Sequence, residues 1–207
     1  MITQANNADD PFPIWGTCMG FQLLTYLTSG ENLLTDTNST LVSYPLYFQQ
    51  AYKTSKLFGS GSAETGDIIN ILSKENVTFN AHFYGITPKT FNNNTKLRTF
   101  YRMLTTNYDD NGKEFVSMIE AFKYPFYGAQ WHPEKNNFEF VAKLGPNLHH
   151  SADAIKVTLY MAQFFVNEAR KSSHKFKNAT EEAAALIYNF PVVYTAGNTS
   201  YEQCYFF

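Results

Sequence analysis

The chain contains 207 residues, of which 44% are hydrophobic and 17% aromatic, and its formal net charge is −2. A chain of this composition can bury a sizeable core, which excludes a disordered protein, and we expect one domain over residues 1–207. The weak charge provides no basic surface for nucleic acid and no polybasic patch for a membrane, and no apolar run reaches the ~18 residues that span a bilayer. We therefore expect neither a nucleic-acid partner nor a membrane partner.

The first predicted elements are a short strand and a helix joined by a tight turn. Residues 1–10 are predicted to form a loop, 12–15 a buried strand and 21–28 a helix that ends before Gly30. The turn Gly16-Thr17-Cys18-Met19-Gly20 carries a cysteine at its tip, where the free N–H groups and positive end of the helix dipole favour a thiolate. By itself this turn supports a nucleophile and a small buried cysteine equally.

Loops and short elements are predicted for the middle of the chain, followed by a hairpin. The predicted order is a mixed, loop-rich segment (30–66), a short helix (67–73), a half-buried strand (77–83) and a hairpin with strands at 98–106 and 113–121 around Asp109-Asp110-Asn111-Gly112. His82 shares one face of its strand with Thr78 and Asn80, and from alternation alone a solvent-exposed histidine is the simpler interpretation.

The final third is predicted to contain a strand at 124–131, a long helix starting after Ser151, a short helix at 181–188 and an edge strand at 201–207. Apolar residues at helical spacing define the face of the long helix expected to pack on the sheet: Ile155, Leu159, Ala162, Val166 and Ala169. Neighbouring His149 and His150 point apart, so we expect no metal site, and no motif calls for a cofactor.

The segment Gly128-Ala129-Gln130-Trp131-His132-Pro133-Glu134 supplies a possible partner for the cysteine. Pro133 prevents a helix there, and in an extended segment His132 and Glu134 point the same way. A carboxylate beside an imidazole fixes its tautomer and stabilises the imidazolium that forms when the ring takes a proton. A lone His-Pro-Glu is more often a structural turn, but its combination with the Cys18 turn favours catalysis.

These two segments resemble the class I glutamine amidotransferase-like superfamily, which places a Cys-His-Glu triad on them. Within it, the chain is most similar to the gamma-glutamyl hydrolase family of cysteine peptidases, which trims folate polyglutamates. That closer resemblance rests on Trp15 and on the segments 79–83, 164–170, 185–188 and 203–205.

The resemblance implies an α/β fold, a three-layer sandwich with a mostly parallel central sheet. It also implies roles: Cys18 as nucleophile, His132 as proton shuttle, Glu134 as the group that orients His132, and the Met19 backbone N–H as an oxyanion donor. His82 matches a family histidine near the substrate. Gln22 follows the wider amidotransferase pattern, whereas some gamma-glutamyl hydrolases have an acidic residue there.

The expected reaction is hydrolysis of gamma-glutamyl bonds in folylpoly-gamma-glutamates through a thioester, without a cofactor. One alternative is a glutaminase-type amidotransferase domain, which uses the same triad to supply ammonia to a synthase. The other is a truncated, inactive form. Only ten residues precede Pro11, so the resemblance implies that the family's opening strands and a second oxyanion donor are missing. We expect a weakly active and poorly stable chain, in which a homodimer is one arrangement that would cover the exposed sheet edge.

Two features concern the compartment. Cys18 and Cys204 are too few for a disulfide framework, so both are expected as free thiols. Five sequons begin at Asn38, Asn76, Asn93, Asn178 and Asn198. With the family resemblance they favour a glycosylated lysosomal or secreted protein, although the residues at the start of the chain lack a signal peptide, which suggests a fragment or an alternative start.

Overall fold

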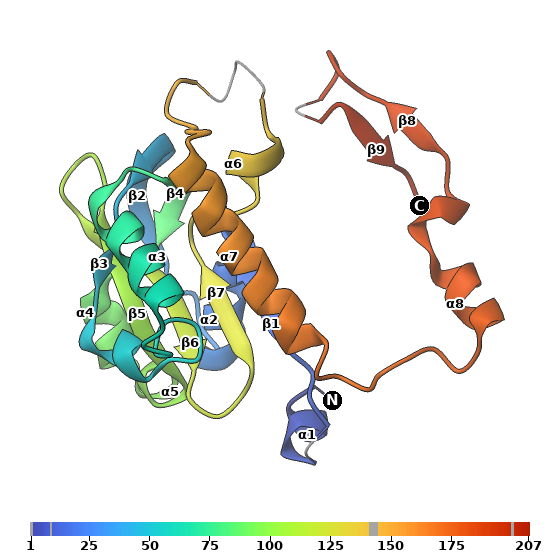
Figure 1. Ribbon diagram of the computed structural model, residues 1–207, viewed down its shortest axis with the longest axis horizontal. Helices are drawn as coiled ribbons and strands as arrows, with labels where there is room; N and C mark the ends of the chain where they lie inside the picture. Colours follow the sequence, from blue (N-terminus) through green and yellow to red (C-terminus); the bar gives the residue numbers. More distant parts are fainter. Residues whose placement is uncertain (1, 9, 141–144, 200) are drawn as a thin grey trace. The chain divides into compact units, whose positions relative to one another are not determined.

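The computed structural model describes residues 2–8, 10–140, 145–199 and 201–207, and Figure 1 shows its secondary structure. The chain divides into two compact units, residues 1–172 and residues 173–207. The two units are described separately below, and their union in one domain stays a prediction. In the described part of the chain no helix is long and apolar enough to cross a membrane.

A five-stranded sheet lies at the centre of the first unit. Its strand order is β1 (Ile14–Thr17), β7 (Phe126–Ala129), β6 (Glu114–Ala121), β5 (Tyr101–Tyr108) and β3 (Tyr47–Phe48). The predicted hairpin is confirmed as β5–β6, and Gly112 in its turn has φ 77°, a conformation suited to glycine. The α/β class is confirmed, but only β1 and β7 pair in parallel among the described strands, so the sheet has less parallel pairing than predicted.

Helices cover both faces of this sheet, which gives the predicted three layers. On one face lie α3 (Ala63–Lys74) and α7 (Ala152–Ala169), as Figure 1 shows. Their buried residues share a core cluster with Leu104 and Met118 of the sheet. On the other face lie α2 (Met19–Ser29), α4 (Pro88–Asn93) and α5 (Thr95–Phe100). The hydrophobic core therefore consists of two clusters, one on each side of the sheet.

A second, two-stranded sheet pairs β2 (Thr35–Tyr44) with β4 (Thr78–Gly85) in antiparallel fashion. β4 confirms the predicted strand, but β2 falls in the segment that we predicted to be loop-rich. The reason is that the β2 sequence is dominated by threonine, serine and other polar residues, and pairing with β4 satisfies its backbone.

The helices differ from the predictions in three ways. Residues 2–7 form a helix, α1 (Ile2–Asn7), where a loop was predicted. Ser62 caps α3 by accepting a hydrogen bond from the Thr65 N–H, so this helix starts earlier than predicted. α7 begins after Ser151 as predicted, but it buries the face with Ala154, Val157 and Met161, while Leu159 and Val166 are exposed. The described part of this unit also contains two short helices, η1 (Gln50–Thr54) and α6 (Lys135–Phe138).

The second unit is small. It contains α8 (Ala179–Ala185), the short helix η3 (Ile187–Asn189) and a hairpin of β8 (Val192–Tyr194) with β9 (Gln203–Tyr205). A strand, β9, lies within the predicted 201–207, but it is shorter than predicted and pairs with β8 in a separate two-stranded sheet instead of adding an edge to the larger sheet. Nearly all described side chains of this unit are exposed, so it has little core of its own.

Candidate active site

Cys18 lies at the junction between β1 and α2. Its backbone has φ 52° and ψ −105°, which is unusual for a residue with a side chain and marks a strained, sharp turn. The Cys18 N–H donates to the carbonyl of Ala129 at 2.7 Å, so the turn is attached to the end of β7. This strand-to-helix turn presents the thiol at the edge of the sheet.

The same edge of the sheet carries His132. Because β1 and β7 are parallel, with Thr17 opposite Ala129, the segments that follow them leave the sheet on the same side. The His132 N–H donates to the carbonyl of Phe79 at 2.8 Å and fixes the backbone of this turn. The structure thus brings Cys18 and His132 together from positions more than one hundred residues apart.

The His132 ring lies between a thiol and a carboxylate. Its Nδ1 atom is 2.7 Å from Oε1 of Glu134, and the ring also interacts with the Cys18 side chain. Burial alone would lower the pKa of His132, but hydrogen bonds to Cys18 and Glu134 and the charge of Glu134 outweigh it and raise the pKa to about 9. The ring is therefore disposed to hold a proton at neutral pH.

Glu134 is half exposed, with 54% of its side chain accessible, and it stands at the start of α6. Desolvation would raise the pKa of its carboxyl, but the hydrogen bond and charge of His132 hold that pKa below its usual value. Glu134 is thus a carboxylate that orients Nδ1 of His132 and leaves the opposite ring nitrogen, Nε2, to face other groups.

Two glutamines connect the cysteine to β4. The Gln22 Nε2 atom donates to the carbonyl of Tyr84 at 2.9 Å and to Oε1 of Gln130 at 3.3 Å. The Gln130 Nε2 atom is 3.8 Å from the Cys18 sulfur, within reach of an N–H···S hydrogen bond. Gln130 was not among the predicted site residues, although it stands inside the predicted His132 segment.

His82 is buried, with 4% of the residue exposed, rather than open to solvent. Its Nδ1 atom is 3.0 Å from the Thr37 hydroxyl and its Nε2 atom 3.2 Å from Oδ1 of Asn80. Desolvation lowers the pKa of His82 to about 4, so the ring is neutral at pH 7. Both ring nitrogens are engaged by the protein, and a role for His82 in substrate binding stays a prediction.

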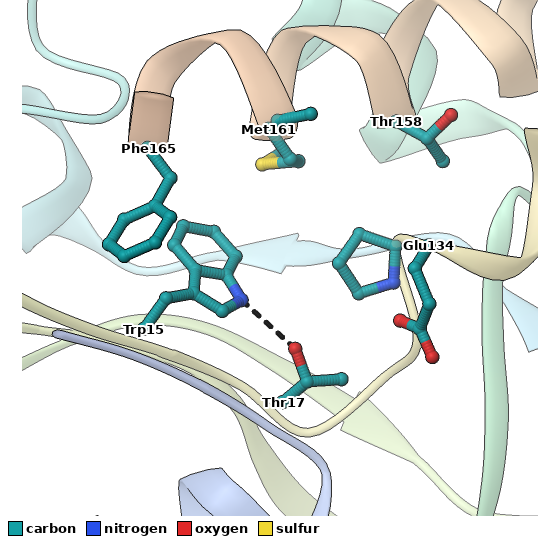
Figure 2. A pocket seen from close by; sticks show the side chains of 8 residues that line it. Trp15, Thr17, Glu134, Thr158, Met161 and Phe165 are labelled. Carbon is teal, nitrogen blue, oxygen red and sulfur yellow. Dashed lines mark hydrogen bonds between the residues drawn. The ribbon is translucent and has the colours of Figure 1, made fainter. Parts of the chain in front are cut away.

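Glu134 also lines a small cavity of about 200 Å³. Figure 2 shows Thr158, Met161 and Phe165 of α7 on one side of it and Trp15, Thr17 and Glu134 on the other. Trp15, Met161 and Phe165 form its apolar walls, and the Trp15 indole N–H donates to the Thr17 hydroxyl at 3.0 Å. The remaining lining residues are Pro133, Glu134, Thr158 and Ala162. Trp15 was singled out from the sequence, but no sequence pattern predicted that α7 would lie against the turn that carries Pro133 and Glu134.

The remaining predicted positions are the sequon asparagines and Cys204. All five sequon asparagines are exposed (Asn38, Asn76, Asn93, Asn178 and Asn198), and Ser200 of the last sequon lies outside the described residues. Cys18 and Cys204 are both free thiols, as predicted. Among the residues that the structure describes, no group of histidine, cysteine and carboxylate side chains could hold a metal ion.

The fold and the site define a class I glutamine amidotransferase-like protein. Residues 1–144 match the family described as glutamine amidotransferase class-I, and the chain belongs to this family. Its cysteine turn and its His-Pro-Glu turn both fall inside the matched residues.

Curated relatives of the chain are gamma-glutamyl hydrolases. The chain is 45% identical to that of Mus musculus over 96% of this chain and 61% of the relative, and 44% identical to that of Homo sapiens over 99% and 62%. It is 40% identical to gamma-glutamyl hydrolase B of Dictyostelium discoideum over 100% of this chain and 58% of the relative. The chain thus spans about three fifths of the length of these relatives.

Proposed function

We propose that this chain carries the catalytic cysteine, histidine and glutamate of a gamma-glutamyl hydrolase. The observation that supports the proposal is that His132 interacts with the Cys18 side chain and that its Nδ1 atom lies 2.7 Å from Glu134 Oε1. A nucleophile, a base within hydrogen-bond reach and a third group that orients the base form the arrangement required for nucleophilic catalysis. The similarity to gamma-glutamyl hydrolases indicates which amide bond is attacked.

In this mechanism the Cys18 sulfur, as a thiolate, attacks the carbonyl carbon of the gamma-glutamyl amide. The Met19 N–H, at the start of α2, donates to the oxyanion, because the first N–H groups of a helix lack partners within it. The protonated His132 gives its proton to the leaving amine, and a thioester remains. The ring then removes a proton from water, which attacks the thioester and releases the acid and the Cys18 thiolate.

The substrates that we propose are folylpoly-gamma-glutamates, and Gln22 and His82 are the proposed contacts to them. The five sequons, whose asparagines are exposed, support passage through the secretory route to the lysosome or the exterior. A homodimer would fit the unpaired outer edge that β1 has among the described strands.

The deciding experiment compares products. The chain is incubated with a pteroyl-poly-gamma-glutamate and, separately, with free glutamine. Shortened glutamate chains detected by mass spectrometry, with little ammonia from glutamine, are the expected result. Rapid release of ammonia with intact polyglutamate would favour the glutaminase alternative. The absence of both products would favour an inactive form.

Substitutions connect the activity to the site. Cys18→Ala and His132→Ala are expected to lower kcat by on the order of 10⁴-fold or more, because members of such a unit act together. Glu134→Ala is expected to have a smaller effect, since it orients the base. The matched control is Cys204→Ser, which removes the second free thiol in β9. Loss of activity with Cys204→Ser, and not with Cys18→Ala, would overturn the assignment.

A further inference from the structure

Gln130 is a buried polar side chain to which the mechanism above gives no task. None of its surface is exposed, and its backbone N–H donates to the carbonyl of Ser117 at 2.8 Å, which fixes the residue at the end of the sheet. A buried side-chain amide is costly unless its donors and acceptor are used. The hydrogen-bond partners of this amide therefore indicate the role of Gln130.

The two ends of the Gln130 amide have different partners. Its Oε1 atom accepts from Gln22, and its Nε2 atom donates toward the Cys18 sulfur. With the oxygen engaged by Gln22, the amide group turns its NH₂ toward the thiol. The carbonyl of Tyr84 accepts from the same Gln22 nitrogen, so Gln22 is held in place from the end of β4. A chain of hydrogen bonds thus runs from β4 to the nucleophile.

We propose that Gln130 is a positioning residue that donates a hydrogen bond to the Cys18 thiolate, and that Gln22 orients the Gln130 amide for this purpose. A donor aimed at sulfur favours the ionised form over the neutral thiol. The proposal rests on Cys18 being the nucleophile of the proposed function. It differs from a role in the oxyanion hole, because the donor faces sulfur and not the carbonyl oxygen.

Loss of the hydrogen bond to Cys18 should change the pH dependence of its reaction and leave the reactivity of the fully ionised thiol nearly unchanged. The negative charge leaves sulfur when the thioester forms, so a donor to the thiolate stabilises the reactant more than the transition state. Loss of the donor should therefore reduce the fraction of thiolate at neutral pH, while the rate at high pH, where all of the thiol is ionised, stays nearly the same. If Gln130 had only a structural role, its loss would not lower the fraction of thiolate at neutral pH while leaving the rate at high pH nearly the same.

The experiment measures the rate of Cys18 alkylation by iodoacetamide against pH, in the Cys204→Ser chain so that one thiol reacts. Gln130→Met removes the amide with little change in volume. We expect the midpoint of its profile to move to higher pH by about one unit, which corresponds to about tenfold slower alkylation below the midpoint. The plateau at high pH should stay within about twofold. An unmoved midpoint, with a cooperative thermal melt, would overturn the proposal.

Ser117→Ala is the matched control. Ser117 is also fully buried, next to Gln130, and its hydroxyl has no hydrogen-bond partner in the part of the chain that the structure describes. This substitution should leave the midpoint unchanged, and an equal shift would show that any buried change nearby has the effect, which also overturns the proposal.

Gln22→Leu provides the second test. Gln22 is only half-buried, so we expect this variant to fold even if Gln130→Met does not. It should move the midpoint in the same direction by a smaller amount, and no movement would contradict the proposed chain of hydrogen bonds. Alkylation needs no substrate, so these results are independent of whether gamma-glutamyl hydrolysis is found. A shifted midpoint without hydrolysis would sustain this inference and refute the proposed function.

Discussion

The protonation state of His132 is set by opposing effects. Burial disfavours the charged ring, whereas the thiol on one side and the carboxylate on the other favour it, and the net result is a pKa of about 9. The raised pKa means that the imidazolium, once formed, persists through neutral pH and is lost only as the pH rises toward 9. The carboxylate of Glu134 is the partner whose removal tests this balance most directly.

Glu134→Gln should lower the titration midpoint of the His132 ring by more than one pH unit. The amide keeps a hydrogen-bond acceptor for Nδ1 but removes the negative charge. Desolvation, which lowers the pKa of the ring, is then opposed less strongly. Nuclear magnetic resonance of the ring carbons against pH provides the measurement. Glu139→Gln is the control, because Glu139 pairs with Lys135 in the same turn and does not contact the ring. A midpoint that stays near 9 in Glu134→Gln would contradict this account.

The proximity of Cys18, His132 and Glu134 could be predicted because each lies in a local pattern with few alternatives. A cysteine between two glycines after an apolar strand predicts a sharp turn. His132 and Glu134 were expected to point the same way because their segment was predicted to be extended, but that prediction was wrong. Glu134 has helical dihedral angles, φ −79° and ψ −19°, and lies in the turn that leads into α6, and its side chain nevertheless reaches His132. Gln130 could not be predicted, because the direction of its amide depends on Gln22, which is distant in sequence. For His82 the alternation gave the correct face of the strand, but it did not show that this face is buried.

At the scale of elements, the glycines on either side of Cys18 have different importance. A Cβ atom added to Gly16 would lie 2.6 Å from both the carbonyl carbon and the oxygen of Gly20, which are backbone atoms and cannot move aside easily. A Cβ atom added to Gly20 would meet nothing within 4 Å. The close approach of β1 to the first turn of α2 therefore depends on Gly16.

Gly16→Ala is expected to lower the free energy of unfolding by about 2 kcal/mol or more, since overpacking against fixed atoms forces the backbone to shift. Gly20→Ala should preserve it or raise it by up to about 1 kcal/mol, because alanine is a better helix former. Urea unfolding of the two variants beside the parent chain measures both effects. Equal destabilisation by the two substitutions would show that the close contact at Gly16 is not the determining feature.

The predicted elements were most accurate where the chain follows one pattern and least accurate where tertiary contacts decide. The helix after Ser151 was correctly predicted, but its apolar residues encircle it, and packing selected Val157 and Met161 for the core instead of Leu159 and Val166. The strand β2 was missed because its polar sequence carries no alternation signal, and only pairing with β4 makes it a strand.

At the scale of the whole molecule, the neutral buried His82 links stability to pH. Its folded-state pKa of about 4 lies below the ordinary value of 6.5, so the unfolded chain binds more protons between these pH values. The contribution of neutral His82 to the free energy of unfolding is therefore fully present above about pH 6.5, and it is lost as the pH falls toward 4. The size of the loss is on the order of 3 kcal/mol.

His82→Gln should flatten the pH dependence of the free energy of unfolding between pH 6.5 and 4. Chemical unfolding at a series of pH values, in the parent chain and the variant, gives the two slopes. Glutamine does not titrate in this range, although it is expected to lower stability at pH 7 because the hydrogen bonds to Thr37 and Asn80 change. The exposed His149, replaced by glutamine, is the control and should preserve the steep dependence. Identical slopes in the parent chain and His82→Gln would refute this role.

The distribution of the core predicts how much of the chain folding requires. Every residue of the two hydrophobic clusters belongs to residues 1–172, and the last of them, Phe164, lies in α7. Since burial of apolar surface supplies most of the stability, residues 1–172 should fold without residues 173–207. We expect a cooperative thermal melt for the shortened chain and a free energy of unfolding within about 1 kcal/mol of that of the full chain.

The comparison of circular dichroism melts for residues 1–172 and 1–207 tests this expectation. A shortening that also removes residues 152–172 is the control, because it deletes α7 with the buried Val157 and Met161 and should abolish the cooperative melt. If the 1–172 chain melts without cooperativity, the core clusters alone do not determine the folding unit. The last 35 residues, 173–207, would then have to contribute to folding despite the near absence of buried side chains among those described in that unit.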